Sequence, residues 1–231
     1  SKQMTESLFF GIVLSLGGYF LGLKLQKKTG LKFLNPLLTS ILMVILVLVV
    51  FRIPFADYDY GAKYLSYFLT PATVCLAVPL YRQFALLKRY PVVILASIIT
   101  GALSSMGSIF LLCLLFGSKT EFFISMLPKS ITTAIGMGLS QELGGIPEIS
   151  VAAIVITGIF GNMAGEAICR IFKITDPIAV GLALGTSAHA IGTAKALELG
   201  EVEGAMSSLS ITVCGLLTVL FASFFVRFYP I

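Results

Sequence analysis

Residues 128–145 read PKSITTAIGMGLSQELGG, and residues 181–200 read GLALGTSAHAIGTAKALELG. Both stretches are rich in glycine and hydroxyl side chains, and strongly apolar runs flank both of them. Non-helical backbone survives at membrane depth only where protein or water satisfies its polar groups. We therefore expect these two stretches to be interrupted segments that face each other inside a helical membrane protein.

The composition around them requires a lipid bilayer as solvent. Hydrophobic residues make up 57% of the 231 residues and charged residues only 12%, whereas a soluble protein carries roughly a quarter charged residues. Apolar runs lie at 7–23, 37–51, 63–81, 91–117, 147–172, 177–197 and 205–229, and a spanning helix takes about 20 residues. We predict an all-α integral membrane protein, a polytopic helical bundle, with residues 1–231 forming a single transmembrane transporter-like domain.

A third unusual segment is the run at 63–81, which contains Pro71 and Pro79. Proline removes a backbone donor and breaks the helical hydrogen-bond ladder. The sequence therefore predicts a kinked or discontinuous helix here, with Pro71 and Thr73 near the transport pathway.

Parts of the chain resemble one another. An offset of 57 residues aligns Ile99-Thr100-Gly101 with Ile156-Thr157-Gly158, and an offset of 56 aligns Ala134-Ile135-Gly136 with Ala190-Ile191-Gly192. Chance similarity among common membrane residues is the alternative. Internal repeats with interrupted helices in corresponding positions indicate a transporter binding site.

The net charge of +5 does not indicate a nucleic-acid partner, because the cations lie in short runs between apolar stretches. Such runs mark cytoplasmic loops, which places residues 24–34 and 82–89 inside and the N-terminus outside. Arg170 and Lys173 favour a cytoplasmic end after 147–172, which makes 128–145 re-entrant. If every apolar segment crosses the membrane fully, Arg170 and Lys173 lie outside instead.

Lys129 and its neighbours are candidates for binding an anion. Pro128 followed by Lys129, Ser130, Thr132 and Thr133 has the pattern of a helix N-terminus. The free amides at such a terminus favour an anion, and Lys129 adds a full positive charge. The alternative is that Lys129 extends to the interface and Ser130 caps the helix.

His189 is the only histidine, and it lies among Thr186, Ser187 and Thr193. Ionisable groups inside membranes are costly and mark functional pathways, and near-neutral titration suits histidine to proton coupling. A packing role is the alternative.

Asn162 and Glu166 lie one turn apart in 147–172 and are candidates for lining the pathway, together with Lys195. The alternatives are ion pairs, Glu166 with Arg170 and Lys195 with Glu198. The four cysteines stand far apart without metal-ligand spacing, so we expect neither a metal nor a cofactor. The sequence carries no nucleophile elbow, zinc pattern or phosphate loop, so we do not expect an enzyme.

Four strings in order carry a family resemblance: LNPLL (34–38), LTPATVCLAVPLY (69–81), LPKSITTAIGMGLSQELGGIP (127–147) and GTSAHAIGTAKALELGEVEGAMSSLS (185–210). With them the chain resembles the LrgB/CidB family of bacterial membrane proteins, which is related to the plastid glycolate/glycerate translocator. The resemblance implies a multi-pass protein of the bacterial inner (cytoplasmic) membrane. Many relatives have proline where this chain has Ala134.

The resemblance implies two functions. The first is transport of small monocarboxylates of the glycolate/glycerate, pyruvate or lactate class, with His189 as the candidate for proton coupling. The alternative is an antiholin-like regulator of murein hydrolase activity and autolysis, acting with a small holin-like membrane partner of the LrgA/CidA type. We rank transport of a small organic anion first, and we expect a homo-oligomer. The predicted substrate-binding residues are Lys129, Ser130, Thr132, Thr133, Thr186, Ser187, His189 and Thr193.

Overall fold

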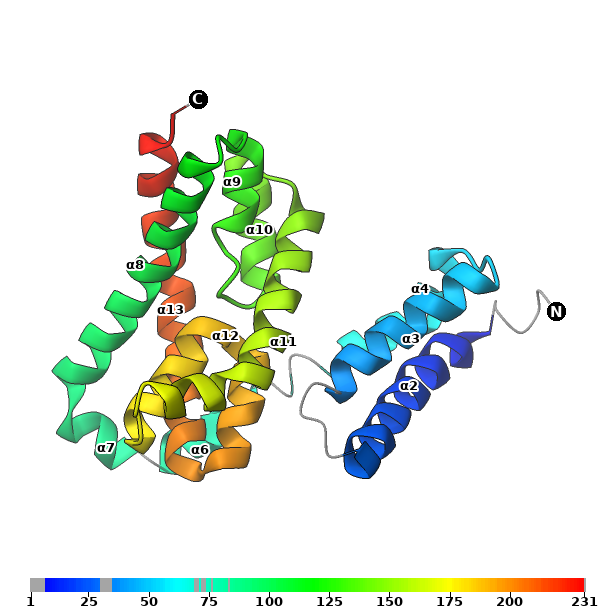
Figure 1. The fold of residues 1–231 in the computed structure, drawn as a ribbon, viewed down its shortest axis with the longest axis horizontal. Coiled ribbons are helices and arrows are strands. Elements are labelled where there is room, and N and C mark those ends of the chain that lie inside the picture. The colour runs from blue at the N-terminus through cyan, green and yellow to red at the C-terminus, as the bar shows by residue number, and fades with distance from the viewer. Residues whose placement is uncertain are drawn as a thin grey trace. The chain divides into compact units, whose positions relative to one another are not determined.

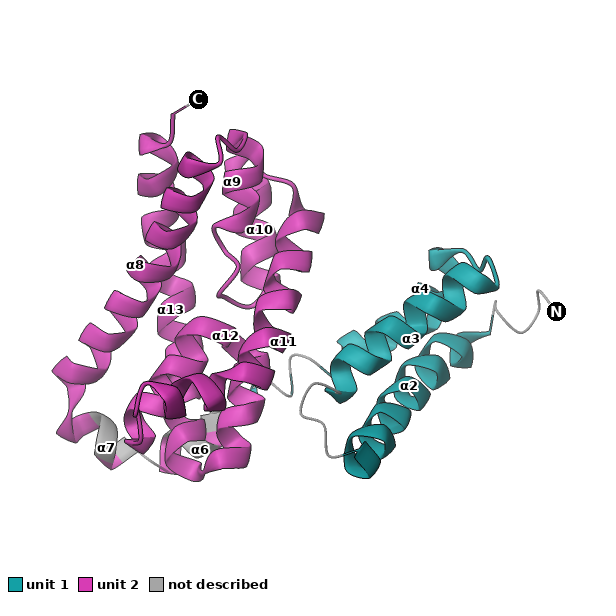
Figure 2. Ribbon diagram, viewed as in Figure 1, with its two compact units in different colours: residues 1–75 teal, residues 76–231 magenta. Residues whose placement is uncertain are grey.

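The computed structural model describes residues 7–29, 35–68, 71, 74–75, 77–82 and 84–230. Helices account for all of the regular secondary structure in these ranges, which confirms the all-α prediction (Figure 1). The backbone divides into two compact units, residues 1–75 and 76–231 (Figure 2). The single transmembrane domain over 1–231 stays a prediction.

Unit 1 contains helices α2 (Leu8–Thr29), α3 (Pro36–Val50) and α4 (Phe55–Ser66). The side chain of Asn35 begins α3 by accepting a hydrogen bond from the amide of Leu37 at 2.8 Å. Gly22 of α2 lies so close to α3 that a Cβ there would be 2.8 Å from Cα of Pro36. Helix α4 begins at Phe55 with Asp57 in its first turn, in the stretch between the apolar runs at 37–51 and 63–81.

The run at 63–81 is divided between separate helices, as predicted. Helix α4 ends at Ser66, α6 covers Ala77–Arg82, and α7 covers Phe84–Arg89. Pro71 is exposed, and Thr73 lies outside the described residues.

Three long continuous helices organise unit 2: α8 (Pro91–Leu115), α11 (Pro147–Ile171) and α13 (Glu201–Phe228). The 25 residues of α8 extend about 38 Å, more than the roughly 30 Å of a bilayer's hydrocarbon core. With α2 and α12 (Pro177–Leu199), they are the five described helices long and apolar enough to cross a membrane. The chain is therefore a multi-pass membrane protein.

The first interrupted segment of unit 2 consists of α9 (Thr120–Met126), a turn at 127–132, and α10 (Thr133–Leu143). The amide of Ile146, just before α11, donates to the hydroxyl of Ser125 in α9 at 2.7 Å. The segment thus returns to the end of the unit where α8 finishes and α11 begins (Figure 1). Residues 120–143 are therefore re-entrant, and the alternative of a full crossing is wrong.

The expected helix start at Pro128 is also wrong. The amide of Lys129 donates to the carbonyl of Met126, so Pro128 lies in the turn that ends α9. Thr132 is the N-cap of α10, whose first residue is Thr133. A fixed φ suits proline to a helical turn at either position, so the pattern alone did not distinguish them.

The second interrupted segment is α12, which breaks at His189 with φ 43° and ψ −136°. The two halves fold back on each other so closely that a Cβ at Gly192 would lie 2.5 Å from the carbonyl oxygen of Leu184. Both outer ends of α12 contact the beginning of α13, through Gly181 with Glu203 and Leu197 with Gly204. Helix α12 is therefore re-entrant from the end of unit 2 opposite to α9 and α10 (Figure 1).

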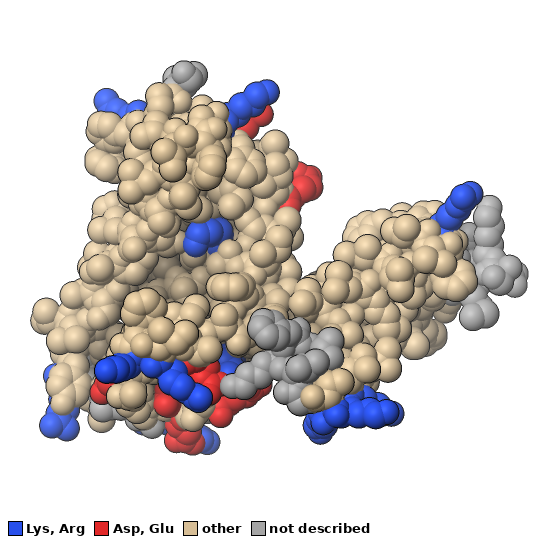
Figure 3. Space-filling view, in the orientation of Figure 1, with Lys and Arg blue, Asp and Glu red and all other residues tan. Residues whose placement is uncertain are grey.

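Unit 2 thus contains the same arrangement twice: a long helix that begins with proline, α8 or α11, followed by a re-entrant segment. The second copy runs in the opposite direction, which is the inverted repeat typical of transporters. The repeated order agrees with the predicted internal repeat. Charged side chains of both signs gather at the α12 end (Figure 3), where Arg82 pairs with Glu201 at 3.4 Å.

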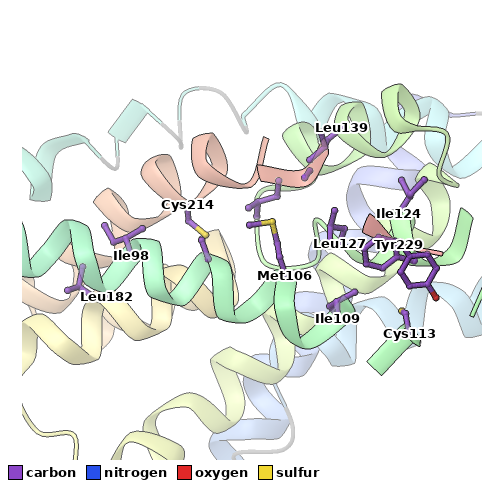
Figure 4. Packing of buried hydrophobic residues seen from close by; sticks show 14 of the residues in the cluster. Ile98, Met106, Ile109, Cys113, Ile124, Leu127, Leu139, Leu182, Cys214 and Tyr229 are labelled. Carbon is purple, nitrogen blue, oxygen red and sulfur yellow. The ribbon is translucent and has the colours of Figure 1, made fainter. Parts of the chain in front are cut away.

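The opposite end of unit 2 is closed by aromatic packing. Phe123 of α9 and Tyr229 stack with ring centroids 4.1 Å apart, and Phe110 of α8 packs against both edge-on. The Tyr229 hydroxyl donates to the carbonyl of Ser118 at 2.7 Å. Leu127, Ile109 and Met106 continue this core inward (Figure 4). The tight packing holds the turn at 127–132 in place from one side.

Candidate functional site

A cavity of about 510 Å³ lies between α8, the turn at 127–132, α11 and α12. A basic side chain stands beside a hollow on this face of unit 2 (Figure 3). The residues that line the cavity are Gly101, Ser104, Ser105, Ser108, Lys129, Ser130, Thr157, Phe160, Gly161, Gly165, Ile168, Cys169, Ile174, Ala183, Leu184, Thr186 and Ser187. Pockets of this size bind small molecules.

Lys129 is the cation of this cavity. Its ammonium nitrogen Nζ lies 3.0 Å from the hydroxyl of Ser130 and 3.2 Å from the hydroxyl of Ser105, and these hydroxyls are 2.9 Å apart. An ammonium group only donates, so both serine oxygens accept from it. The ion pairs among the described residues do not include Lys129. The charge is therefore held by neutral hydroxyls and is available to an anion.

Thr186 and Ser187 also line the cavity, but their hydroxyls donate hydrogen bonds to backbone carbonyls of α12 itself. Thr186 donates to the carbonyl of Leu182 at 2.7 Å, and Ser187 donates to that of Ala183 at 2.6 Å. Each hydroxyl has one hydrogen to donate. In this arrangement the two side chains offer a ligand only acceptor lone pairs, which suits an anion less well than Lys129 does.

His189 does not line this cavity. Its side chain is buried, and its Nε2 lies 2.9 Å from the backbone carbonyl of Ile154. A carbonyl oxygen only accepts, so Nε2 carries a hydrogen and donates it. Thr193 is fully buried. Its hydroxyl donates to the carbonyl of His189 at 3.0 Å and lies 2.7 Å from the hydroxyl of Ser207. These bonds hold the break in α12 in position.

The φ of 43° at His189 is unusual for a side chain that has a Cβ atom. We expect His189→Gly to unfold at a higher temperature than His189→Ala, because both lose the bond to Ile154 but only glycine tolerates this φ freely. The difference should be about 1 kcal/mol in the free energy of unfolding. Thermal unfolding of the two purified variants measures it. An alanine variant at least as stable as the glycine variant would contradict a strained break.

The other predicted site residues that the structure describes do not line the cavity. Thr132 and Thr133 are half-buried at the start of α10. Asn162 donates to the carbonyl of Ile191 at 3.0 Å and so links α11 to the second half of α12.

Glu166, proposed for the pathway, lies instead in an ion-pair network. Its carboxylate is 2.9 Å from Arg170 and 3.4 Å from Lys195, and Lys195 is 3.2 Å from Glu198. The structure therefore contains both ion pairs that the sequence analysis gave as the alternative, Glu166 with Arg170 and Lys195 with Glu198. The network links α11 to the second half of α12.

Sequence reasoning did not single out the hydroxyl face of α8. Ser104, Ser105 and Ser108 all line the cavity. Residues at spacings of three and four share one face of a helix. The row of three serines inside an apolar run was therefore the sequence feature that could have predicted this part of the cavity. Among the described residues, no group of three or more His, Cys, Asp or Glu side chains is placed to hold a metal ion.

The fold and the cavity define a class: a multi-pass helical membrane protein whose interior is built from two re-entrant segments of opposite direction. The family model described as the LrgB-like family matches residues 15–228. The chain belongs to this family, as its motifs predicted.

Curated relatives support the same family. The chain is 40% identical over 226 residues to the antiholin-like protein LrgB of Bacillus subtilis (strain 168), which covers 97% of this chain and 98% of the relative. It is 39% identical over 225 residues to proteins of the same name from Bacillus cereus (strain B4264) and Bacillus anthracis (strain CDC 684 / NRRL 3495), with the same coverage. No solved structure matches the chain.

Proposed function

We propose that this protein carries small monocarboxylates of the glycolate/glycerate, pyruvate or lactate class across the bacterial inner membrane. The observation that supports this most directly is Lys129, a cation held by two serine hydroxyls at the wall of a cavity between re-entrant segments. A charge at membrane depth is costly and is retained for function. A carboxylate in the cavity would neutralise it.

In this proposal the carboxylate accepts hydrogen bonds from Lys129 and from the hydroxyl of Ser105 or Ser130. The hydroxyls of Ser105 and Ser130 lie 2.9 Å apart, so one of them donates to the other, and the remaining hydroxyl hydrogen is free to turn toward an anion because both oxygens accept from Lys129. The re-entrant segments come from opposite ends, so movement of each one exposes the cavity to a different side. Thr132, Thr133, Thr193 and His189 are proposed to shape the two breaks, with His189 as the candidate proton carrier.

The test is uptake of labelled pyruvate, lactate and glycolate into proteoliposomes that contain the purified chain. We expect saturable uptake of at least one acid, and a reduction of about tenfold in Ser105→Ala, since a hydrogen bond to a charged group contributes roughly 1.5–3 kcal/mol. Ser97→Ala is the matched control, because Ser97 is an exposed serine of α8 whose hydroxyl donates to the carbonyl of Val93 in its own helix. His189→Ala is measured beside them at equal amounts of folded protein.

A second candidate function is favoured by the names of the relatives, which are antiholin-like proteins. In that function the chain would regulate murein hydrolase activity and autolysis with a small LrgA/CidA-like membrane partner. Absence of uptake of all three acids, with folded protein and a pH gradient of either sign, would favour it. Repeating the assay with the small partner in the same liposomes separates an obligatory partner from a regulator without transport. We expect homo-oligomers in either case.

A further inference from the structure

The cavity is much larger than the three-carbon acids of the proposed function. A volume of about 510 Å³ corresponds to about 17 water molecules at about 30 Å³ each. Pyruvate has six heavy atoms, so even at a water's volume per heavy atom it fills only about a third of this space. The residues that line the remaining space therefore bear on which ligands the cavity can hold.

Polar and apolar residues lie at opposite ends of the cavity. Gly101 of α8 contacts Thr186 of α12, and Ser105 lies one turn further along α8, toward the turn that holds Lys129. Gly165 of α11 contacts Leu184 of α12, and Ile168 lies further along α11, toward the α12 end of unit 2. Since α8 and α11 run in opposite directions, the serines and Ile168 lie at opposite ends.

The apolar end is a continuous wall. Gly161, Gly165 and Ile168 recur at helical spacing, so they line one face of α11 over about 10 Å, and Thr157 lies on the same face toward the polar end. Beyond Gly161, the wall is completed by Leu184 of α12 and by Ile174 of the link between α11 and α12. Gly165 brings α12 close, because a Cβ there would lie 2.5 Å from a methyl carbon of Leu184. An alkyl chain fits this wall, and a second charged group does not.

We propose that the apolar wall is a binding subsite for the alkyl chain of an amphiphilic carboxylate whose head group lies at Lys129. This inference rests on the proposed function and deepens it, because it extends the substrate class to monocarboxylates with an apolar chain of several carbons. The carboxylate binds Lys129, Ser105 and Ser130. The chain lies along Ile168, Leu184 and Ile174.

The experiment is competition against labelled pyruvate bound to the purified chain in lipid nanodiscs, which contain no pH gradient for a weak acid to collapse. The competitors are acetate, butyrate and hexanoate. Each CH₂ group transferred to an apolar surface should strengthen binding about fourfold. We expect the inhibition constant to fall at least about tenfold from acetate to hexanoate.

Matched variants separate the subsite from partition into lipid. Ile168→Ser should remove most of the gain for hexanoate and leave acetate unchanged. Ile171→Ser makes the same change in the same helix at an exposed position that does not line the cavity, and it should behave as the natural chain. Both positions are partly or fully exposed, so both variants should fold.

The outcomes distinguish this inference from the proposed function. Equal inhibition constants for the three acids, with pyruvate bound, would overturn the subsite and leave transport standing. A chain-length effect unchanged by Ile168→Ser would assign it to the lipid and would also overturn the subsite. If pyruvate itself does not bind, the proposed function fails at this cavity, and labelled hexanoate tests the subsite directly: binding lost in Ile168→Ser supports it, and no binding overturns it.

Discussion

Replacing Lys129 with Met should lower pyruvate uptake by about 100-fold. The change keeps most of the apolar stem but removes the charge that two serine hydroxyls hold in the cavity. Hydrogen bonds to a charged group contribute roughly 1.5–3 kcal/mol, and about 1.4 kcal/mol corresponds to tenfold in affinity. An anion at membrane depth also loses its counter-charge. Initial rates of labelled pyruvate uptake into proteoliposomes measure the effect.

Lys119→Met is the matched control for this prediction. Lys119 is an exposed lysine just before α9 and does not line the cavity. The same loss of one charge there should leave uptake within about twofold of the natural chain, because exposed charges contribute little. If Lys129→Met transported as well as Lys119→Met, the anion site would not be at Lys129, and the proposed function would lose its main support.

Replacing Gly192 with Ala adds one methyl group and should destabilise the protein strongly. The added Cβ would lie 2.5 Å from the carbonyl oxygen of Leu184 and 2.7 Å from the Cβ of Ala188. Neither atom belongs to the end of a flexible side chain, so the two halves of α12 must move apart. Overpacking of a tight core costs typically 1–3 kcal/mol and occasionally more. We expect a value at or above the upper end, with little monodisperse protein after purification.

Gly138→Ala provides the comparison, because a Cβ at this position of α10 meets no atom within 4 Å. Alanine is favoured over glycine in a helix by about 0.5–1 kcal/mol, so this variant should unfold at a slightly higher temperature. Size-exclusion profiles and thermal midpoints of the two variants make the measurement. Equal midpoints would mean that the halves of α12 do not pack against each other as closely as the structure has them.

The sequence anticipated the interrupted segments because their composition is inconsistent with contact to lipid. Apolar runs predicted α8, α11 and α13 to within a few residues, since a membrane span must have both the length and the hydrophobicity of the bilayer core. The helix at Phe55–Ser66 was missed. Its aspartates and tyrosines resemble a loop by composition, and its helical state depends on packing against α2, where Tyr58 meets Ser15.

The site itself was predicted only in part. Lys129 and Ser130 were predicted because a lysine in an apolar chain needs an explanation, and both line the cavity. Ser105 was missed, because a serine inside a spanning helix is common and bonds its own backbone in the absence of a partner. His189 was expected to meet the substrate but bonds the carbonyl of Ile154 instead. No local pattern could predict that partner, which lies 35 residues away along the chain.

The sequence by itself determined the solvent, the approximate bounds of several long apolar helices and the two stretches that could not be ordinary lipid-facing helices. These properties follow from composition along the chain, because lipid accepts only apolar side chains and satisfied backbone groups. Only the tertiary structure decided that the segments re-enter from opposite ends and that Lys129 meets Ser105. Direction and contact depend on how helices pack, and glycines such as Gly165 and Gly192 set that packing through distances that no local pattern encodes.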